Sequence, residues 1–208
     1  HNLDDAAERV ARLLRGTDGL DHHGLGRGVV EVVAHGVPIG LGSHVHWDRR
    51  LDGLLAQALL SIQAVKGVEI GDGFDVAARP GSQAHDPIVW DAEHSVYRRI
   101  SANAGGIEGG MSTGEVLVAH VAMKPLATLN KPVLATVDTA TKESGVSFRE
   151  RTDVTAVPAM GVVAEAMTAL VLASESLRKF GGDSLAEFVR NHDTYVAQVR
   201  AQSARIDT

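Results

Sequence analysis

The chain has 208 residues, a length typical of one globular domain or of one domain with an appendage. Its 20 Lys and Arg residues against 26 Asp and Glu residues give a net charge of −6, which argues against a nucleic-acid partner, since phosphate binding requires clustered positive charge. The chain contains no cysteine, which excludes thiol catalysis, thiolate zinc sites and disulfides within it. The longest apolar stretch, residues 162–173, is interrupted by Glu165 and falls short of the roughly 20 residues of a membrane span, so we expect no membrane segment.

Helix and strand patterns alternate through the first third of the chain. Apolar residues at three- and four-residue steps predict helices, and runs of β-branched residues predict strands. A helix and a glycine-rich loop form an N-terminal segment, residues 1–27. The elements expected up to residue 73 are a helix over 3–15, a strand over 29–34, a second short strand over 37–41, a helix over 51–62 capped near Asp48, and a strand over 65–70.

The rest of the chain combines a long irregular stretch with strands and two helices. Residues 74–110 contain little periodicity, and a loop of this length inside a compact domain is usually functional. Residues 157–179 are nearly continuous in Ala, Val, Met and Leu, which predicts a helix that is apolar on most sides and central to the core. The other expected elements are strands over 115–123, 132–138 and 145–149, and a last helix capped by Asp183 or Ser184 with Leu185, Phe188, Val189, His192, Tyr195 and Val199 on one face.

The order of these elements predicts an α+β fold. Strands and helices are interleaved without strict strand–helix–strand alternation, so we expect antiparallel pairing, with the sheet packed on central helices. This domain occupies residues 28–208, and the sequence contains no internal repeat.

Glycines form the first candidate functional motif, with five of them in residues 104–114. Without Cβ atoms, backbone N–H groups there can approach a phosphate or a flat ring closely. The motif matches neither the dinucleotide-binding fingerprint nor a P-loop. A long bulged turn is the alternative interpretation, and composition alone favours it.

Two further motifs carry charge, and each has an ordinary structural alternative. Residues 149–153, Arg-Glu-Arg-Thr-Asp, either cap the helix that follows or bind an anion and move a proton. Residues 124–128 begin with Lys-Pro at the end of a strand, where a cation and free N–H groups can meet an anion or simply form a turn.

Histidines suggest a metal site only weakly. His44 and His46 would point to one face of a strand, and Asp48 or His85 could add a third ligand. No further motif supports such a site, so we expect structural or surface histidines and no metal.

Four segments together resemble chorismate synthase. They are residues 62–74 (IQAVKGVEIGDGF), residues 103–114 (NAGGIEGGMSTG), Lys124-Pro125, and Arg151-Thr152-Asp153 with Ala156-Val157-Pro158. They occur in the family's order at plausible separations, and the similarity extends from about Gly28 to Arg190.

The resemblance implies a lyase of the shikimate pathway that converts 5-enolpyruvylshikimate 3-phosphate into chorismate. The reaction is a 1,4-elimination of phosphate with loss of a ring hydrogen, and it requires reduced FMN, for which NADPH is a possible reductant. The family further implies a β-α-β sandwich in which antiparallel sheets enclose central helices, a homotetramer and a cytoplasmic location.

The resemblance also implies roles for individual residues. Asp153 would be the carboxylate near the flavin that helps the proton leave. Thr155 stands where many relatives carry Cys, and Leu126-Ala127 replaces the more usual hydroxyl residues, but neither change removes a charge. The residues implied to line the flavin site are Gln63, Ala64, Gly109, Lys124, Pro125, Leu126, Ala127, Thr128 and Arg151.

The family's two catalytic histidines, its paired arginines and its Arg-Ser-Ser-Ala cofactor segment have no counterpart here, and the chain begins at His1 without a Met. We therefore expect this chain to be the C-terminal half of a chorismate synthase. Two alternatives stay open, a catalytically incomplete flavin-binding fragment and an NADPH-dependent flavin reductase.

Overall fold

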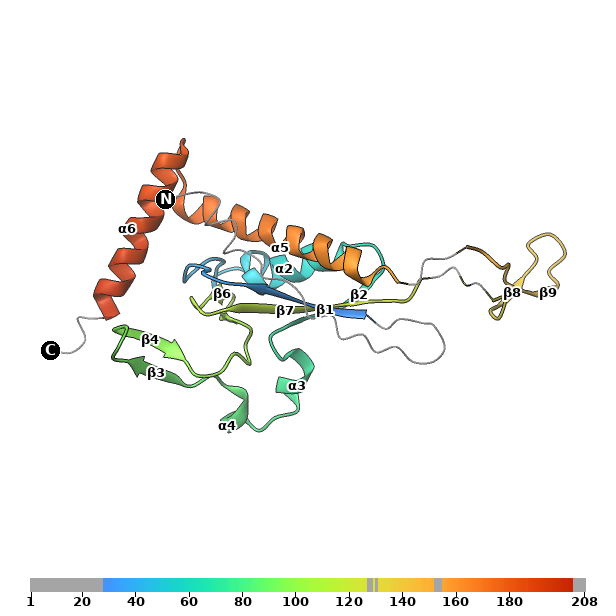
Figure 1. The fold of residues 1–208 in the computed structure, drawn as a ribbon, viewed down its shortest axis with the longest axis horizontal. Helices are drawn as coiled ribbons and strands as arrows, with labels where there is room; N and C mark the ends of the chain where they lie inside the picture. Colours follow the sequence, from blue (N-terminus) through green and yellow to red (C-terminus); the bar gives the residue numbers. More distant parts are fainter. Residues whose placement is uncertain (1–27, 127–128, 130, 152–154, 204–208) are drawn as a thin grey trace.

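The computed structural model of the chain describes residues 28–126, 129, 131–151 and 155–203. A three-stranded sheet is covered on one face by two helices, and two hairpins project from this body in different directions (Figure 1). The helix predicted over residues 3–15 lies outside the described residues. The α+β fold with antiparallel strands is confirmed.

The central sheet has the strand order β1-β7-β2, with β1 over Gly28–Ala34, β7 over Leu117–Met123 and β2 over Val65–Ile70. Both pairings are antiparallel, and Val121 in the middle strand lies opposite Val30 on one side and Val68 on the other. Alternation puts valines on the helix-facing side of β1 and β7, as a half-buried strand requires. The three strands predicted here are confirmed.

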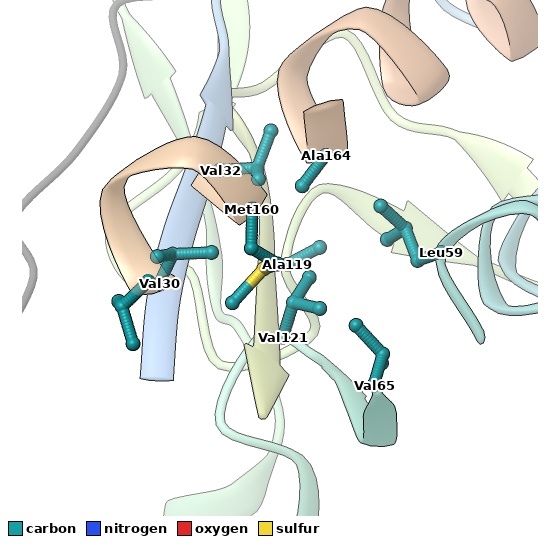
Figure 2. Close-up of a cluster of buried hydrophobic side chains, with 9 residues drawn as sticks. Val30, Val32, Leu59, Val65, Ala119, Val121, Met160 and Ala164 are labelled. Atoms are coloured by element: carbon teal, nitrogen blue, oxygen red, sulfur yellow. The ribbon is translucent and has the colours of Figure 1, made fainter. Parts of the chain in front are cut away.

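Helices α2 (Leu51–Leu60) and α5 (Val157–Phe180) pack on this face of the sheet. Together they bury an apolar core that Figure 2 shows between the strands and the first turns of α5. Its members are Val30, Val32, Leu59, Val65, Ala119, Val121, Val157, Met160 and Ala164.

Helix α5 is buried along one stripe only, which corrects the prediction that most of its sides face the core. Leu172 is 5% exposed, whereas Leu170, two residues earlier on the opposite side, is 62% exposed. Apolar composition shows that a helix can be buried on several faces, but the described residues cover only one face of α5. The exposed stripe contains Val162, Val163, Leu170 and Leu177.

Helix α5 is longer than the apolar stretch of residues 162–173, whose shortness led us to expect no membrane segment. Its 24 residues are long and apolar enough, by length and composition alone, to cross a membrane. Core helices of globular domains share these properties. Contacts with α2, β1 and β7 indicate that α5 is such a core helix here.

Helix α6 (Leu185–Ser203) turns away from α5 after Gly181, whose φ is +58°. The Ser184 hydroxyl accepts from the N–H of Glu187 at 3.3 Å, so the predicted cap is confirmed at Ser184. Part of the predicted apolar face packs on the Phe180 ring, which contacts the rings of Phe188, His192 and Tyr195. Leu185 and Val189, which were predicted on the same face, are exposed.

The stretch 74–110, predicted as a loop, contains short elements. They include α3 (Gly73–Ala77), α4 (Gly81–Ala84) and a hairpin of β3 (Ile88–Asp91) with β4 (Val96–Arg99). None spans enough residues to show a period in the sequence. The rings of Trp90 and Tyr97 meet edge to face across the hairpin, with centroids 4.9 Å apart.

Two smaller predictions near α2 are wrong. Residues 37–41 form no strand, because Pro38 lacks an N–H and the chain turns at Gly40, where φ is +81°. Asp48 does not cap α2; it lies in a short 3-10 helix, η1 (Trp47–Arg49). The first N–H of α2, from Leu51, donates instead to the Gly110 carbonyl oxygen at 2.8 Å.

The second hairpin, β8 (Ala135–Val137) with β9 (Ser144–Val146), extends away from the body (Figure 1). Every residue of both strands is exposed, and both strands are shorter than predicted, since none of the described residues buries them against the body.

Candidate functional site

The end of α2 meets the end of β7 at the first part of the predicted site. Gln63 and Ala64 connect α2 to β2, and the N–H of Lys124 donates to the Ala64 carbonyl oxygen at 2.9 Å. This contact follows directly from the register, because Val65 lies opposite Met123. The sheet therefore brings together two predicted segments that are far apart in the sequence.

Ala64 adopts a backbone conformation that favours glycine. Its φ is +67°, in the left-handed region that residues with a Cβ occupy only at a cost. Strained backbone of this kind persists where the surroundings fix it, and such positions cluster at functional sites. The exposed side chains of Gln63 and Lys124 flank it, so a polar surface with a cation lies at this edge.

The start of α5 lies at the same end of the sheet. Gly28 pairs with Met123, and a Cβ on Gly28 would come within 1.9 Å of a methyl group of Val157, the first residue of α5. The segment that carries Arg151 leads into this helix, and Arg151 is exposed. The positive end of the helix dipole and the exposed Lys124 favour anionic groups here.

Gly109 lies elsewhere. It forms the turn between β5 (Ile107–Glu108) and β6 (Met111–Ser112) together with Gly110, with φ values of +58° and +83°. Positive φ at both central residues defines the tight hairpin turn that glycine favours. This turn contacts the start of α2, whereas Gln63 follows its end, so the length of the ten-residue α2, about 15 Å, separates them.

The predicted site residues thus form two groups within one chain. Gln63, Ala64 and Lys124 lie together, Pro125 and Leu126 continue from Lys124, and Gly109 is at the other end of α2. Ala127, Thr128 and Asp153 lie outside the described residues.

The described residues fit a flavin in two respects. A Cβ built on Gly109 meets nothing within 4 Å, so a planar group can reach this exposed backbone. At the other group, Lys124 is an exposed cation suited to a phosphate, and Arg151, in the segment before α5, is a second exposed cation.

The histidines considered as metal ligands are exposed in the structure. His44 and His46 precede η1 and are not on a strand, and His85 follows α4. Within residues 28–203, as far as the structure describes them, no three His, Asp or Glu side chains are grouped to hold a metal ion.

Residues 103–114 form the glycine-rich loop that ends near the Gly109 turn and β6, and two charged residues beside this loop were not singled out from the sequence. Asp86 is buried, and Arg99 pairs with Glu108, the residue before Gly109. Their segment lacks periodicity, so no pattern in the sequence predicts that its charged side chains point inward.

Comparison with known proteins gives one consistent result. The family model described as chorismate synthase matches residues 5–177. The chorismate synthase of Nocardioides sp. is 61% identical over 173 residues, which cover 83% of this chain and 43% of the relative. The chorismate synthase of Kocuria rhizophila is 58% identical over 195 residues, which cover 93% of this chain and 46% of the relative.

A solved structure described as a crystal structure of chorismate synthase is similar to this one as well. The TM-score is 0.70 at 46% sequence identity, and the match covers 85% of this chain and 45% of the other. The chain therefore spans somewhat less than half the length of the relatives it matches.

Proposed function

The chain belongs to the chorismate synthase family, and we propose that it supplies part of the active site of a lyase that makes chorismate from 5-enolpyruvylshikimate 3-phosphate. The observation that carries this proposal is the family match over residues 5–177, which contains every residue predicted for the flavin site. Both the relatives and the solved structure carry the same family name.

Reduced FMN, when bound, supplies electron density that assists departure of the phosphate in the proposed 1,4-elimination. Lys124 and Arg151 bind anionic groups of the cofactor or substrate, and a guanidinium is suited to two parallel hydrogen bonds with a phosphate or carboxylate. Asp153 is the carboxylate that helps the proton leave the ring. The protein's task is to orient the substrate, neutralise its charges and exclude water.

Because the chain spans under half of its relatives' length, activity requires residues outside the matched segment. We propose that this chain alone is a flavin-binding fragment and that the complete site forms only with the remaining part. NADPH as the reductant, a homotetrameric assembly and a cytoplasmic location are parts of the same proposal.

The test is a chimera in which this chain replaces the segment that it matches in the Nocardioides relative. We expect the chimera to release phosphate from 5-enolpyruvylshikimate 3-phosphate under anaerobic conditions with reduced FMN. The 208-residue chain alone should bind flavin but release no phosphate. A chimera that binds flavin but forms no chorismate contradicts the proposed reaction, and one that binds no flavin contradicts the proposed cofactor. NADPH oxidation in the same samples tests the reductant.

Asp153→Asn in the chimera tests the catalytic residue. We expect turnover to fall by about 10²- to 10⁴-fold, the usual contribution of a positioned side chain that assists proton transfer, while flavin affinity stays within twofold of the parent. Asp183→Asn, beyond the matched segment, is the control. Unchanged turnover in the Asp153 variant excludes the assigned role.

A further inference from the structure

The glycine-rich loop is fixed on its inner side by the central sheet. The N–H of Val118 in β7 donates to the Gly105 carbonyl oxygen at 3.1 Å, and the N–H of Asp72 donates to the Asn103 carbonyl oxygen at 2.9 Å. A Cβ on Gly105 would lie 2.2 Å from the Gly71 nitrogen, so no side chain fits between loop and sheet. The loop runs from here to the Gly109 turn.

On its outer side the loop is held by a buried carboxylate. Asp86, 9% exposed, accepts hydrogen bonds from the Ser101 hydroxyl at 2.5 Å, the Asn103 N–H at 2.8 Å and the Ala104 N–H at 2.9 Å. Burial alone would raise the pKa of the Asp86 carboxyl, but these hydrogen bonds and the nearby Arg99 hold it below its ordinary value. The carboxylate form therefore anchors the start of the loop.

An arginine holds the other end. From β4, Arg99 donates through Nε and Nη2 to the two carboxylate oxygens of Glu108, at 2.9 and 2.7 Å. Its own backbone N–H donates to Glu115 at 2.7 Å, so residues on both sides of the Gly109 turn are tied to β4. A two-pronged pair of this kind fixes orientation as well as distance. Glu108 directly precedes Gly109.

We propose that Asp86 and Arg99 are positioning residues that hold the glycine-rich loop in the shape that presents the Gly109 backbone to the flavin. The segment 86–100, including the β3–β4 hairpin, thereby acts as an external support for the loop. Gly109 contacts the flavin only under the proposed function, whereas the support of the loop rests on contacts within this chain.

The first test measures amide hydrogen exchange in the 208-residue chain. Arg99→Gln removes the fork on Glu108, and we expect exchange at residues 107–110 to rise about tenfold or more, because a charge-assisted hydrogen bond is lost. We expect amide hydrogen exchange in β1 and β7 to stay unchanged, and the midpoint of urea unfolding to stay unchanged as well. Arg98→Gln is the matched control, since Arg98 is the adjacent residue and its side chain is 59% exposed.

The second test measures flavin affinity in the chimera described above. We expect Arg99→Gln to weaken FMN binding by about tenfold. Arg99→Lys, which keeps the charge but not the paired hydrogen bonds to Glu108, should recover part of the lost affinity. Asp86→Asn, which removes the charge that anchors the start of the loop, should also weaken FMN binding. If this variant does not fold, Ser101→Ala, which removes one of the three donors to Asp86, takes its place.

The outcomes separate this proposal from the proposed function. A chimera that binds no flavin even without substitutions contradicts the proposed function. Hydrogen exchange in the 208-residue chain then tests the support of the loop independently. Equal loop exchange in the Arg99 and Arg98 variants overturns the support role. Faster loop exchange with unchanged flavin affinity overturns the positioning role.

Discussion

The N–H of Lys124 donates to the carbonyl oxygen of Ala64 at 2.9 Å, and Ala64 holds a φ of +67°. The contact closes the β2–β7 pair, one residue beyond Val65 and Met123. A residue with a Cβ loses roughly 1–2 kcal/mol in this conformation. The surrounding sheet therefore holds Ala64 in a shape it would not adopt alone.

Substitution of Ala64 tests this strain. Ala64→Gly should leave stability unchanged or raise it by up to about 1 kcal/mol, because glycine occupies the left-handed region freely. Ala64→Val should lower it by about 1–3 kcal/mol, since a β-branched residue fits this region worst. Urea unfolding gives both values.

Ala58→Gly serves as the control for the Ala64 variants. Ala58 lies within α2, where glycine costs about 1 kcal/mol, so the same change should have the opposite sign. Destabilisation by glycine at both positions would contradict the strain at Ala64.

Helix α5 allows a second comparison, between a buried and an exposed leucine. Leu172→Ala should lower the free energy of unfolding by about 2–4 kcal/mol, because Leu172 packs in the core with 5% exposure. Leu170→Ala should change it by less than about 0.5 kcal/mol, since that side chain is 62% exposed. Thermal or urea unfolding of the chain alone measures both, and equal losses would mean that α5 is buried on both sides.

The sheet and its helices could be predicted from sequence because their patterns are local. Short runs rich in β-branched residues indicate β1, β2 and β7, and three- and four-residue steps indicate α2 and α6. The exposed stripe of α5 could not be predicted, because composition does not say whether a partner is present. The hairpin of β3 with β4 is too short to show a period and depends on a cross-strand pair, Trp90 with Tyr97.

The site was predictable only as a set of segments. That Ala64 and Lys124 touch depends on the register of β2 against β7, which the spacing of residues along the chain does not encode. The same holds for the separation of Gly109, which follows from the direction of α2. Burial of Asp86 depends on amides that only the folded loop directs at it.

Acid should lower the free energy of unfolding of the chain, partly through protonation of Asp86. Its pKa is depressed in the folded state, so its contribution is fully present above the unfolded value of about 3.9 and is lost as pH falls through the folded value. Asp86→Asn should therefore cost about 2 kcal/mol at pH 7, and the difference from the parent should shrink below about pH 4. Urea unfolding across this pH range measures the difference.

Asp138→Asn provides the matched control for pH. Hydrogen bonds from the Thr141 and Ala140 amides also depress the pKa of Asp138, but this residue lies in the exposed hairpin of β8 and β9. Loss of the Asp138 carboxylate should leave the free energy of global unfolding unchanged at every pH. A difference for Asp86→Asn that stays constant from pH 7 to about pH 3 would contradict the assigned protonation state.

Gly28 fixes how closely α5 approaches the sheet. A Cβ at this position would lie 1.9 Å from a Val157 methyl group, so Gly28→Ala should lower stability by about 1–3 kcal/mol through overpacking. Gly81→Ala is the control, because a Cβ at Gly81 meets nothing within 4 Å and its φ is not positive. Its effect should be within about 0.5 kcal/mol of zero.

A double variant identifies the contact itself. In Gly28→Ala with Val157→Ala the new methyl group occupies part of the space that the valine leaves, so the two losses should not add. We expect the double variant to be at least about 1 kcal/mol more stable than the sum of the single losses predicts. Additive losses would place the cost of Gly28→Ala in the backbone of β1 and not in its contact with α5.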